Sequence, residues 1–365
     1  VRSEIIQQII SAQISINLAE LILIANKYDS IVLFNGRMTC EHAFKQVAKS
    51  RGIKMYFHER MKPNTRFFFE EYQPHIFDKR KEEMQIMRDQ IPVSVINRVG
   101  EEFFKRKVQG EGVYELSYTE NHISNTSINL KTVLDNNKEK KIISYFTNSD
   151  DEYQSIDGVS SRYPFFGNQK LAVKEIVELA ISLDYFLIVR VHPNLKNKSP
   201  RERSRWSELS TYIKDKGFYW VSEDDKESTY DIINKSSIII SAGSTVGAEA
   251  AYLKKKSIVI TNCFYNGVIP SVQLAESKEE LKRCFLDFDN NQLIKPEDSY
   301  IFGAWIMTYG PQYNYFVPLH EYSVLYGLMK DGTRIANPGF FQWNIEVIKY
   351  LLGVGFKNFE NIRKL

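Results

Sequence analysis

The residues best suited to chemistry lie in three short loops, each of which directly follows a strand-like apolar run. The first loop carries three adjacent carboxylates, Asp150, Asp151 and Glu152. Carboxylates crowded at the end of a strand separate their pKa values, so that one of them can act as a general base or a nucleophile. A charged turn is the alternative, because Asp, Ser and Asn are ordinary turn residues. We predict that Asp151 is the acting group, with Asp150 as the second choice.

The second loop combines a histidine with a proline and several nitrogen donors. Pro193 restricts the backbone beside His192, so the imidazole is aimed at one place. Arg190, Asn194 and Lys196 flank this pair and offer further donors to a phosphate or a carboxylate. A loop histidine among solvated lysines is the alternative. Because another donor-rich loop follows in the same half of the chain, we favour ligand binding.

The third loop is a turn of small residues between a strand-like run that ends at Ser241 and a helical segment. Gly243 permits a tight turn, and Ser244 and Thr245 place hydroxyls beside the free N–H groups of the helix start, where phosphate binds well. Glu249 lies one turn further on, where its carboxylate can accept hydrogen bonds from ribose hydroxyls. Simple capping of the helix by the two hydroxyls is the alternative.

Parallel sheets are the elements that position such loops. Short apolar runs alternate with helical segments along the chain, which is typical of a parallel sheet covered by helices on both faces. The strand-like runs cover residues 31–34, 54–57, 142–146, 185–191, 218–221, 238–241 and 257–261. The helical segments cover residues 41–50, 78–107, 170–182, 201–216, 229–235 and 245–254. Folds of this kind bind ligands at the carboxyl ends of their strands, which is where the three loops are expected.

The length of 365 residues favours two α/β lobes with a cleft between them. A polar, turn-rich stretch at residues 155–168 is the predicted join. We therefore expect a doubly wound lobe over residues 1–165, a second over 166–340, and a final segment, 341–365, whose helix returns to the first lobe. In this division the carboxylate loop belongs to the first lobe and the other two loops to the second.

Composition narrows the class of protein. Hydrophobic residues make up 43% and charged residues 25%, as in soluble globular proteins. Polar residues interrupt the apolar stretch 5–25, which favours an amphipathic helix over a membrane span. Three widely spaced cysteines fit a reducing compartment, and we expect a cytoplasmic protein. No metal site is expected, because Asp287 and Asp289, although spaced as Asp-x-Asp, follow a helical segment instead of a strand.

Charge is spread unevenly along the chain. The formal net charge is +3, but residues 37–107 carry 16 Lys and Arg against 10 Asp and Glu. A net charge this small does not indicate a nucleic-acid partner. The basic segment also contains clustered phenylalanines, and such a surface suits an acidic glycan or an anionic lipid head group. Solvated helix faces over a core are the alternative.

Two further motifs complete a pattern that resembles a known group. A strand-like run leads into Asn35-Gly36-Arg37, and another ends in His58-Glu59-Arg60. Together with the three loops, they resemble bacterial capsule and lipopolysaccharide glycosyltransferases of the GT-B fold, which consists of two Rossmann-like lobes. Among these the sequence is most similar to the enzymes that use CMP-activated acidic sugars, particularly the Kdo transferases.

The resemblance implies a role for each motif. His192 and Pro193 would contact the phosphate of CMP, and Ser244 and Thr245 would hold the same phosphate. An Asp in the carboxylate loop would act as a general base in sialyl-type relatives or as a nucleophile in retaining β-Kdo relatives. The sequence departs from the sialyl-type pattern because no glycine follows the Asp-Asp-Glu. The motifs of the first lobe, Asn35, Arg37, His58, Glu59 and Arg60, would face the acceptor or the donor sugar.

We therefore expect a glycosyltransferase that moves Kdo from CMP-Kdo, with retention, onto a surface-polysaccharide or lipid-linked acceptor. The expected partners are the nucleotide-sugar donor, this acceptor, and the inner face of the cytoplasmic membrane or an assembly complex. No cofactor or metal is expected, because one phosphate can be neutralised by a helix terminus, a histidine and an arginine. A nucleotide-sugar epimerase and a non-catalytic glycan-binding domain are the alternatives.

Overall fold

The chain is described by a computed structural model. The described residues are 2–61, 66–110, 127–150, 156, 163, 165–225, 227–287, 294–312, 316–318, 327–329 and 334–335. The expected returning helix in residues 341–365 lies outside them.

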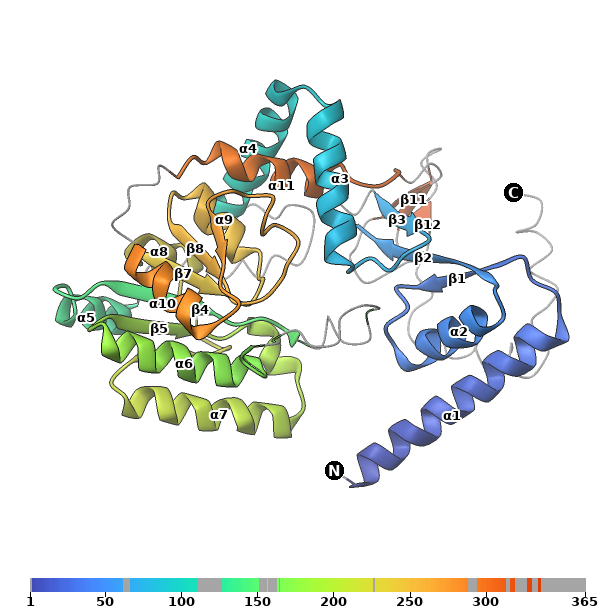
Figure 1. Ribbon diagram of the computed structural model, residues 1–365, viewed down its shortest axis with the longest axis horizontal. Coiled ribbons are helices and arrows are strands. Elements are labelled where there is room, and N and C mark those ends of the chain that lie inside the picture. Colours follow the sequence, from blue (N-terminus) through green and yellow to red (C-terminus); the bar gives the residue numbers. More distant parts are fainter. Residues whose placement is uncertain are drawn as a thin grey trace.

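The larger part of the molecule is built around a parallel sheet of six strands (Figure 1). The strand order in this sheet is β6-β5-β4-β7-β8-β9. Its strands are β4 (Ile142–Phe146), β5 (Phe186–Arg190), β6 (Tyr219–Val221), β7 (Ile238–Ser241), β8 (Lys256–Val259) and β9 (Val272–Leu274). The strand order reverses between β4 and β7, as in Rossmann-like sheets. This arrangement confirms the expected α/β class.

Helices cover both faces of this sheet, which explains why its strands are mostly apolar. On one face lie α6 (Gln169–Ser182), α7 (Pro200–Asp215) and α10 (Lys278–Leu286). On the other face lie α5 (Ile128–Asn136) and α8 (Thr229–Lys235). Alternate residues of β5 serve the two sides: Leu187 and Val189 pack towards α6 and α7, whereas Phe186 and Ile188 pack towards α5 and α8.

A smaller sheet follows the N-terminal helix α1 (Arg2–Ala25) and holds three strands in the order β1-β2-β3. Strands β1 (Ser30–Phe34) and β2 (Lys54–Arg60) are parallel and are joined by α2 (Thr39–Ser50), whereas β3 (Phe67–Glu70) is antiparallel to β2. This described part is smaller than the doubly wound lobe that we predicted. A third, antiparallel sheet consists of β10 (Phe316–Pro318), β11 (Gly327–Met329) and β12 (Arg334–Ile335).

The expected assignment of strand 142–146 to the first lobe is wrong. This strand is β4, which pairs with β5 on one side and β7 on the other, at the middle of the large sheet. The carboxylate loop that follows it therefore begins on the same sheet as the histidine loop and the Ser-Thr turn. The sequence of a single strand does not show which strands it pairs with, because packing decides the pairing.

Helices α3 (Phe77–Gln90) and α4 (Val93–Gln109), placed by sequence in the first lobe, also pack with the second half of the chain. They share a hydrophobic cluster with α9 (Val246–Tyr252) and α11 (Glu297–Thr308) (Figure 1). The contact between α4 and α11 is close: a Cβ atom on Gly100 would lie 2.1 Å from the carbonyl oxygen of Tyr300. Only glycine permits this approach. Because α3 and α4 pack with α9 and α11, the packing does not divide at the predicted boundary, residue 165.

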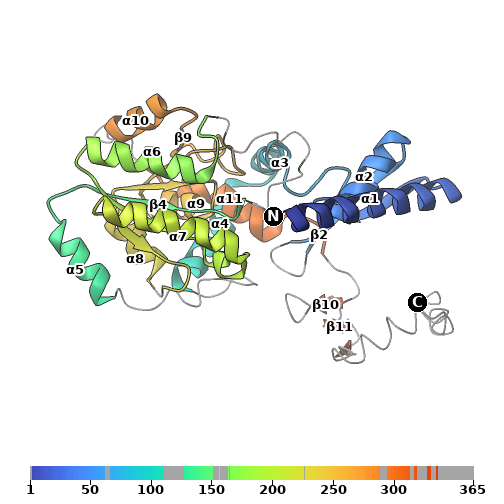
Figure 2. The same cartoon turned by 90° about the horizontal axis from the view of Figure 1, so that it is seen from below.

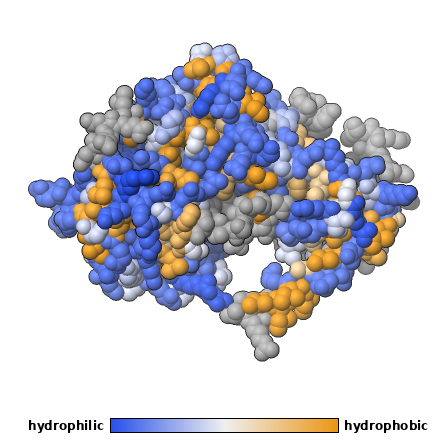
Figure 3. Space-filling model, viewed as in Figure 1, coloured by the Kyte–Doolittle hydropathy of each residue, from blue (hydrophilic) through white to orange (hydrophobic). Residues whose placement is uncertain are grey.

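Helix α1 runs alongside α2 (Figure 2) and packs on it through Ala19 and Leu23. Its remaining isoleucines and leucines are mostly exposed and lie all around the helix, so the expected amphipathic helix is wrong. The helical segment Ile5–Ala25 is long and apolar enough to cross a membrane. In its apolar 18-residue window, 17% is buried inside the protein. Figure 3 shows apolar surface at the lower edge of the part of the molecule that holds α1 and the three-stranded sheet β1-β2-β3.

Candidate functional site

The loops that follow β4, β5 and β7 are linked to one another by hydrogen bonds. The backbone N–H of His192 donates to the hydroxyl oxygen of Thr147 at 2.7 Å, which joins the ends of β5 and β4. The side-chain amide of Asn148 donates to the carbonyl oxygen of Ala242 at 3.1 Å, which joins the ends of β4 and β7. The structure therefore brings the three predicted loops together at the carboxyl edge of one sheet.

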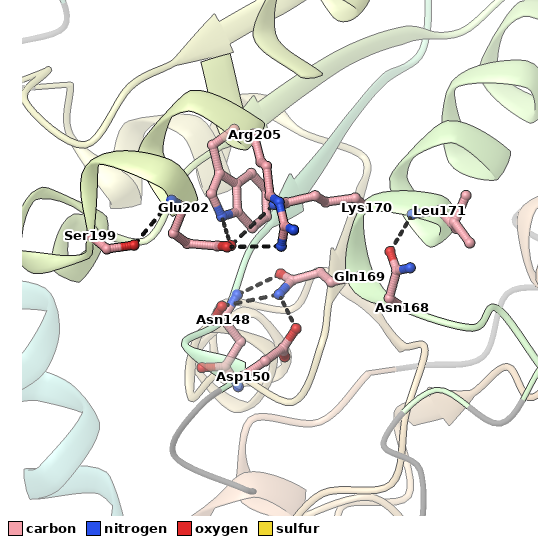
Figure 4. Close-up of polar contacts among 10 residues, drawn as sticks. Asn148, Asp150, Asn168, Gln169, Lys170, Leu171, Ser199, Glu202 and Arg205 are labelled. Atoms are coloured by element: carbon pink, nitrogen blue, oxygen red, sulfur yellow. Dashed lines mark hydrogen bonds and ion pairs between the residues drawn. The ribbon is translucent and has the colours of Figure 1, made fainter. Parts of the chain in front are cut away.

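Asp150 is held firmly at the start of the carboxylate loop. The hydroxyl of Tyr163 donates to Oδ1 at 2.6 Å, and the side-chain amide of Gln169 donates to Oδ2 at 2.9 Å. Gln169, at the first position of α6, also accepts from the backbone N–H of Asn148 at 2.7 Å (Figure 4). Neither Tyr163 nor Gln169 was predicted, because no sequence motif distinguishes them from core residues. Asp151 and Glu152 lie outside the described residues.

His192 is oriented by its own loop. Its Nδ1 accepts from the backbone N–H of Asn194 at 3.2 Å, where Pro193 opens a short 3-10 helix, η3 (Pro193–Asn197). A neutral imidazole that accepts at Nδ1 carries its proton on Nε2, which makes Nε2 a donor. The side-chain amide of Asn194 reaches the hydroxyl of Ser149 at 3.3 Å, which ties this loop to the carboxylate loop.

A pocket of about 710 Å³ opens beside these two loops. Its walls come from the loops after β4 and β5 and from the first turns of α6 and α7. It is lined by Thr147, Asn148, Ser149, Asp150, Asn168, Gln169, Lys170, Leu171, Lys174, Val191, His192, Leu195, Lys198, Ser199, Glu202, Arg205 and Trp206. The volume lies in the range of small-ligand sites in proteins. Asp150 and His192 both face this pocket, so a carboxylate and an imidazole are available to one bound ligand.

Glu202 is the centre of a polar network in the pocket wall. It accepts from Lys170 Nζ at 3.1 Å and from the indole N–H of Trp206 at 3.0 Å, and Arg205 Nη1 lies 3.8 Å away. Figure 4 shows the carboxylate between these groups. Its negative charge is therefore compensated within the wall. None of these residues was predicted, because helix positions beside a pocket carry no loop signal.

Arg190 and Lys196 do not line the pocket. Arg190 is the last residue of β5 and belongs to the face that packs towards α5 and α8, opposite Val191. Burial lowers the pKa of its guanidinium to about 10, and the carboxylates of Glu227 and Asp225 oppose that shift. Arg190 was expected among the donors around His192, but it does not line the pocket that His192 lines.

The Ser-Thr turn has a different environment from the one expected. The Thr245 hydroxyl donates to Glu249 Oε1 at 3.0 Å, and the Tyr230 hydroxyl donates to Oε2 at 3.0 Å. Glu249 is buried, and the Ser244 carbonyl accepts from the Tyr265 hydroxyl. Gly243 has a positive φ of 82°, as the tight turn requires. Helix α9 has only seven residues, and phosphate binding at its start remains a prediction.

The first-lobe motifs meet at the carboxyl ends of β1 and β2. The backbone N–H of Asn35 donates to the His58 carbonyl at 3.0 Å, and the Asn35 side chain accepts from the Arg37 N–H at 3.0 Å. Asn35 has a positive φ of 35° and is almost fully buried. The strand β2 continues through Glu59 and Arg60. Burial lowers the pKa of the His58 imidazole.

Three residues that sequence reasoning missed support these motifs. Buried Lys45 donates to the Gln73 side chain at 3.1 Å, and Gln73 donates to the Asn35 carbonyl at 3.2 Å. His75 Nδ1 lies 3.6 Å from Glu59 Oε2. Burial, with smaller effects of neighbouring arginines, lowers the pKa of His75 to about 3, so this imidazole is neutral at pH 7. In the part of the chain that the structure describes, no group of His, Cys, Asp and Glu could hold a metal ion.

Comparisons with known proteins give similarity of fold only. No family model and no curated protein matches the sequence. A β-Kdo 2,7 transferase, KpsC of Thermosulfurimonas dismutans, has a TM-score of 0.43 and 12% identity, covering 87% of this chain and 84% of that one. The UDP-GlcNAc 2-epimerase of Methanocaldococcus jannaschii has a TM-score of 0.36 and 14% identity, covering 82% and 81%.

Proposed function

We propose that this protein is a glycosyltransferase that binds a nucleotide-activated sugar at the carboxyl edge of its six-stranded sheet. One observation carries the proposal: Asp150 and His192, on loops joined by the Thr147 hydrogen bond, line the same pocket of about 710 Å³. Glycosyl transfer needs a carboxylate near the anomeric carbon and a donor group near the departing phosphate. This edge of the sheet offers both.

His192 is suited to the departing phosphate. Because its Nδ1 is occupied by the Asn194 N–H, the neutral ring presents a donor at Nε2. A donor at that position stabilises negative charge on the phosphate oxygen as the bond to the sugar breaks. The fixed loop keeps the ring oriented without any movement at the moment of reaction.

Asp150 is suited to orienting the carboxylate loop, since both of its oxygens already accept hydrogen bonds from Tyr163 and Gln169. In the proposed reaction the adjacent carboxylate, Asp151, attacks the anomeric carbon while the bond from that carbon to the donor phosphate breaks. An acceptor hydroxyl then displaces the carboxylate and loses its proton, giving net retention.

The proposed donor is CMP-Kdo, and the proposed acceptor is a capsule, lipopolysaccharide or O-antigen glycan or its lipid-linked precursor. The motif pattern described above supports this choice. The motifs around Asn35 and His58 would contact the acceptor or the sugar, at the cytoplasmic face of the membrane. No metal or cofactor is part of the proposed reaction.

A UDP-sugar epimerase is the second candidate. The pocket wall contains four cationic side chains, Lys170, Lys174, Lys198 and Arg205, and such a set also suits the diphosphate of a UDP-sugar. The two candidates differ in their chemistry, because an epimerase inverts one sugar carbon without an acceptor.

Product analysis separates the candidates. The purified protein is incubated with CMP-Kdo and a panel of glycan acceptors, or with UDP-GlcNAc alone, and products are followed by mass spectrometry and NMR. Transfer that needs an acceptor and fails in His192→Ala supports the proposal. Conversion of UDP-GlcNAc to its 2-epimer without an acceptor would replace it with the epimerase.

A further inference from the structure

The pocket beside His192 has an excess of positive charge. Among the described residues that line it, four carry cationic side chains and two carry carboxylates, Asp150 and Glu202. Both carboxylates already have partners: Asp150 accepts from Tyr163 and Gln169, and Glu202 accepts from residues of its own wall. Among these described residues the cations outnumber the carboxylates, so this part of the pocket suits an anion.

Lys174 and Lys198 add positive charge to the pocket lining from two different elements, α6 and the end of η3. Lys170 is engaged by Glu202 at 3.1 Å, whereas Lys174 contacts the ring of Tyr212, with Nζ 5.5 Å from the centroid. A contact with an aromatic ring does not neutralise the charge of an ammonium group.

Two long helices begin at the same pocket. Helix α6 has 14 residues and α7 has 16, and their N-cap residues, Asn168 and Ser199, both line the pocket. The positive ends of both helix dipoles therefore add to the charge of the lysines. Val191, Leu195 and Trp206 supply apolar surface beside them, which excludes water and strengthens the attraction for an anion.

We propose that the space between the first turns of α6 and α7 binds the phosphate of the donor's nucleoside monophosphate, with Lys174, Lys198 and Arg205 as its cationic partners. This inference rests on the proposed function. It moves the phosphate away from the Ser244-Thr245 turn, which does not line the pocket and whose Thr245 hydroxyl is directed to Glu249.

The test is calorimetric titration of the full chain with CMP, with inorganic phosphate, and with cytidine. The pocket variant is Lys174→Gln with Lys198→Gln. The competing location is tested by Ser244→Ala with Thr245→Val. A matched control is Lys214→Gln, a lysine in the last turn of α7, far along the helix from the pocket. Thermal unfolding checks that each variant is folded.

We expect the pocket variant to weaken CMP and phosphate binding about 10- to 100-fold, the usual effect of losing charge-assisted hydrogen bonds, and to leave cytidine binding unchanged. We expect the Lys214 variant to match the wild type and the turn variant to stay within about threefold. The inference is overturned if the turn variant loses CMP and the pocket variant keeps it, or if the pocket variant binds both anions normally.

Failure of the proposed function would look different. If the pocket variant lost phosphate but the wild type transferred no sugar from any nucleotide donor, the phosphate site would stand and the transferase would not. If transfer were normal in the wild type and unchanged in the pocket variant, the transferase would stand and the phosphate site would not.

Discussion

The backbone N–H of His192 donates to the side-chain hydroxyl of Thr147, which is buried at the end of the neighbouring strand, at 2.7 Å. The bond links the first residue after β4 to the second residue after β5. This buried hydroxyl therefore helps to set the position of the imidazole relative to the carboxylate loop, together with the bond from Asn194 to Ser149. This relationship makes Thr147 a positioning residue for the proposed reaction.

We expect Thr147→Val to lower sugar transfer about tenfold, because the histidine loop loses one of its links to the carboxylate loop while the side-chain volume is kept. The free energy of unfolding should fall by about 1 to 2 kcal/mol, the cost of leaving a buried N–H without a partner. Steady-state kinetics and urea denaturation measure the two effects. Thr147→Ser keeps the hydroxyl and should restore transfer; equal loss in both variants would contradict the positioning role.

His192→Ala should lower transfer by about 10²- to 10⁴-fold, the range for a positioned acid or electrostatic group. Stability should change little, because the ring is only partly buried and its Nδ1 accepts from a backbone N–H of its own loop. The turnover number and the free energy of unfolding are measured on the same preparation of each protein. A variant within a few-fold of wild-type turnover would return His192 to an ordinary loop histidine.

Gln169 connects α6 to the carboxylate loop through three bonds: its amide oxygen accepts from the Asn148 N–H, and its amide nitrogen donates to the Asn148 carbonyl and to Asp150. We expect Gln169→Met to cost about 2 to 4 kcal/mol of stability, because buried backbone groups lose their partners. Transfer should fall with it. Gln90→Met, the same substitution at an exposed glutamine at the end of α3, is the control, and equal destabilisation by both would contradict the clamp.

The burial of His75 predicts a pH dependence of stability. Its pKa is lowered from 6.5 to about 3, so between these values the unfolded chain binds a proton that the folded chain does not. Stability should therefore decrease as pH falls below about 6.5, with a slope of up to about 1.4 kcal/mol per pH unit from this residue, and level off below its folded pKa.

The measurement is the free energy of unfolding at pH 7 and pH 5 for the wild type and for His75→Gln. The difference in the free energy of unfolding between pH 7 and pH 5 should be smaller in the variant than in the wild type. The remaining dependence is expected from other groups, including His58, whose pKa burial also lowers. An unchanged difference in the variant would show that His75 titrates normally.

The sequence contains the information for the site's loops but not for their grouping. His192, Asp150 and the Ser-Thr turn were found because polar and small residues directly after apolar runs mark the ends of parallel strands. Assignment of β4 to the first lobe failed because a parallel strand pairs with partners distant in the chain. Local patterns do not carry those pairings.

The pocket wall was missed for a related reason. Lys174 and Arg205 lie on helices, and their spacing is that of ordinary solvated helix residues. Only the packing of α6 beside α7 places them around one space. Arg190 shows the reverse error. It was predicted as a ligand-binding residue because it lies close to His192 in the sequence, but it does not line the pocket.

The last prediction concerns the identity of the nucleophile. Asp150 accepts one hydrogen bond at each oxygen, from Tyr163 and from Gln169, which fixes the orientation of its carboxylate. These bonds stabilise its negative charge and lower its nucleophilicity, and we therefore propose the next residue, Asp151, as the nucleophile. Incubation with CMP-Kdo without acceptor should therefore add about 220 Da, the mass of one Kdo residue, to the intact protein by covalent catalysis.

Peptide mapping should place this increment at Asp151, and Asp151→Asn should abolish both the adduct and transfer. Asp150→Asn keeps the side-chain shape and an acceptor oxygen, and should reduce transfer while the adduct on Asp151 still forms. An adduct on Asp150 would exchange the two roles. An inverted product with no adduct would make the acting carboxylate a general base, because inversion requires a single displacement by the acceptor. Transfer that survives in both variants would remove the loop from the chemistry. Among the described residues, the other carboxylate that lines the pocket is Glu202, which its own wall already binds.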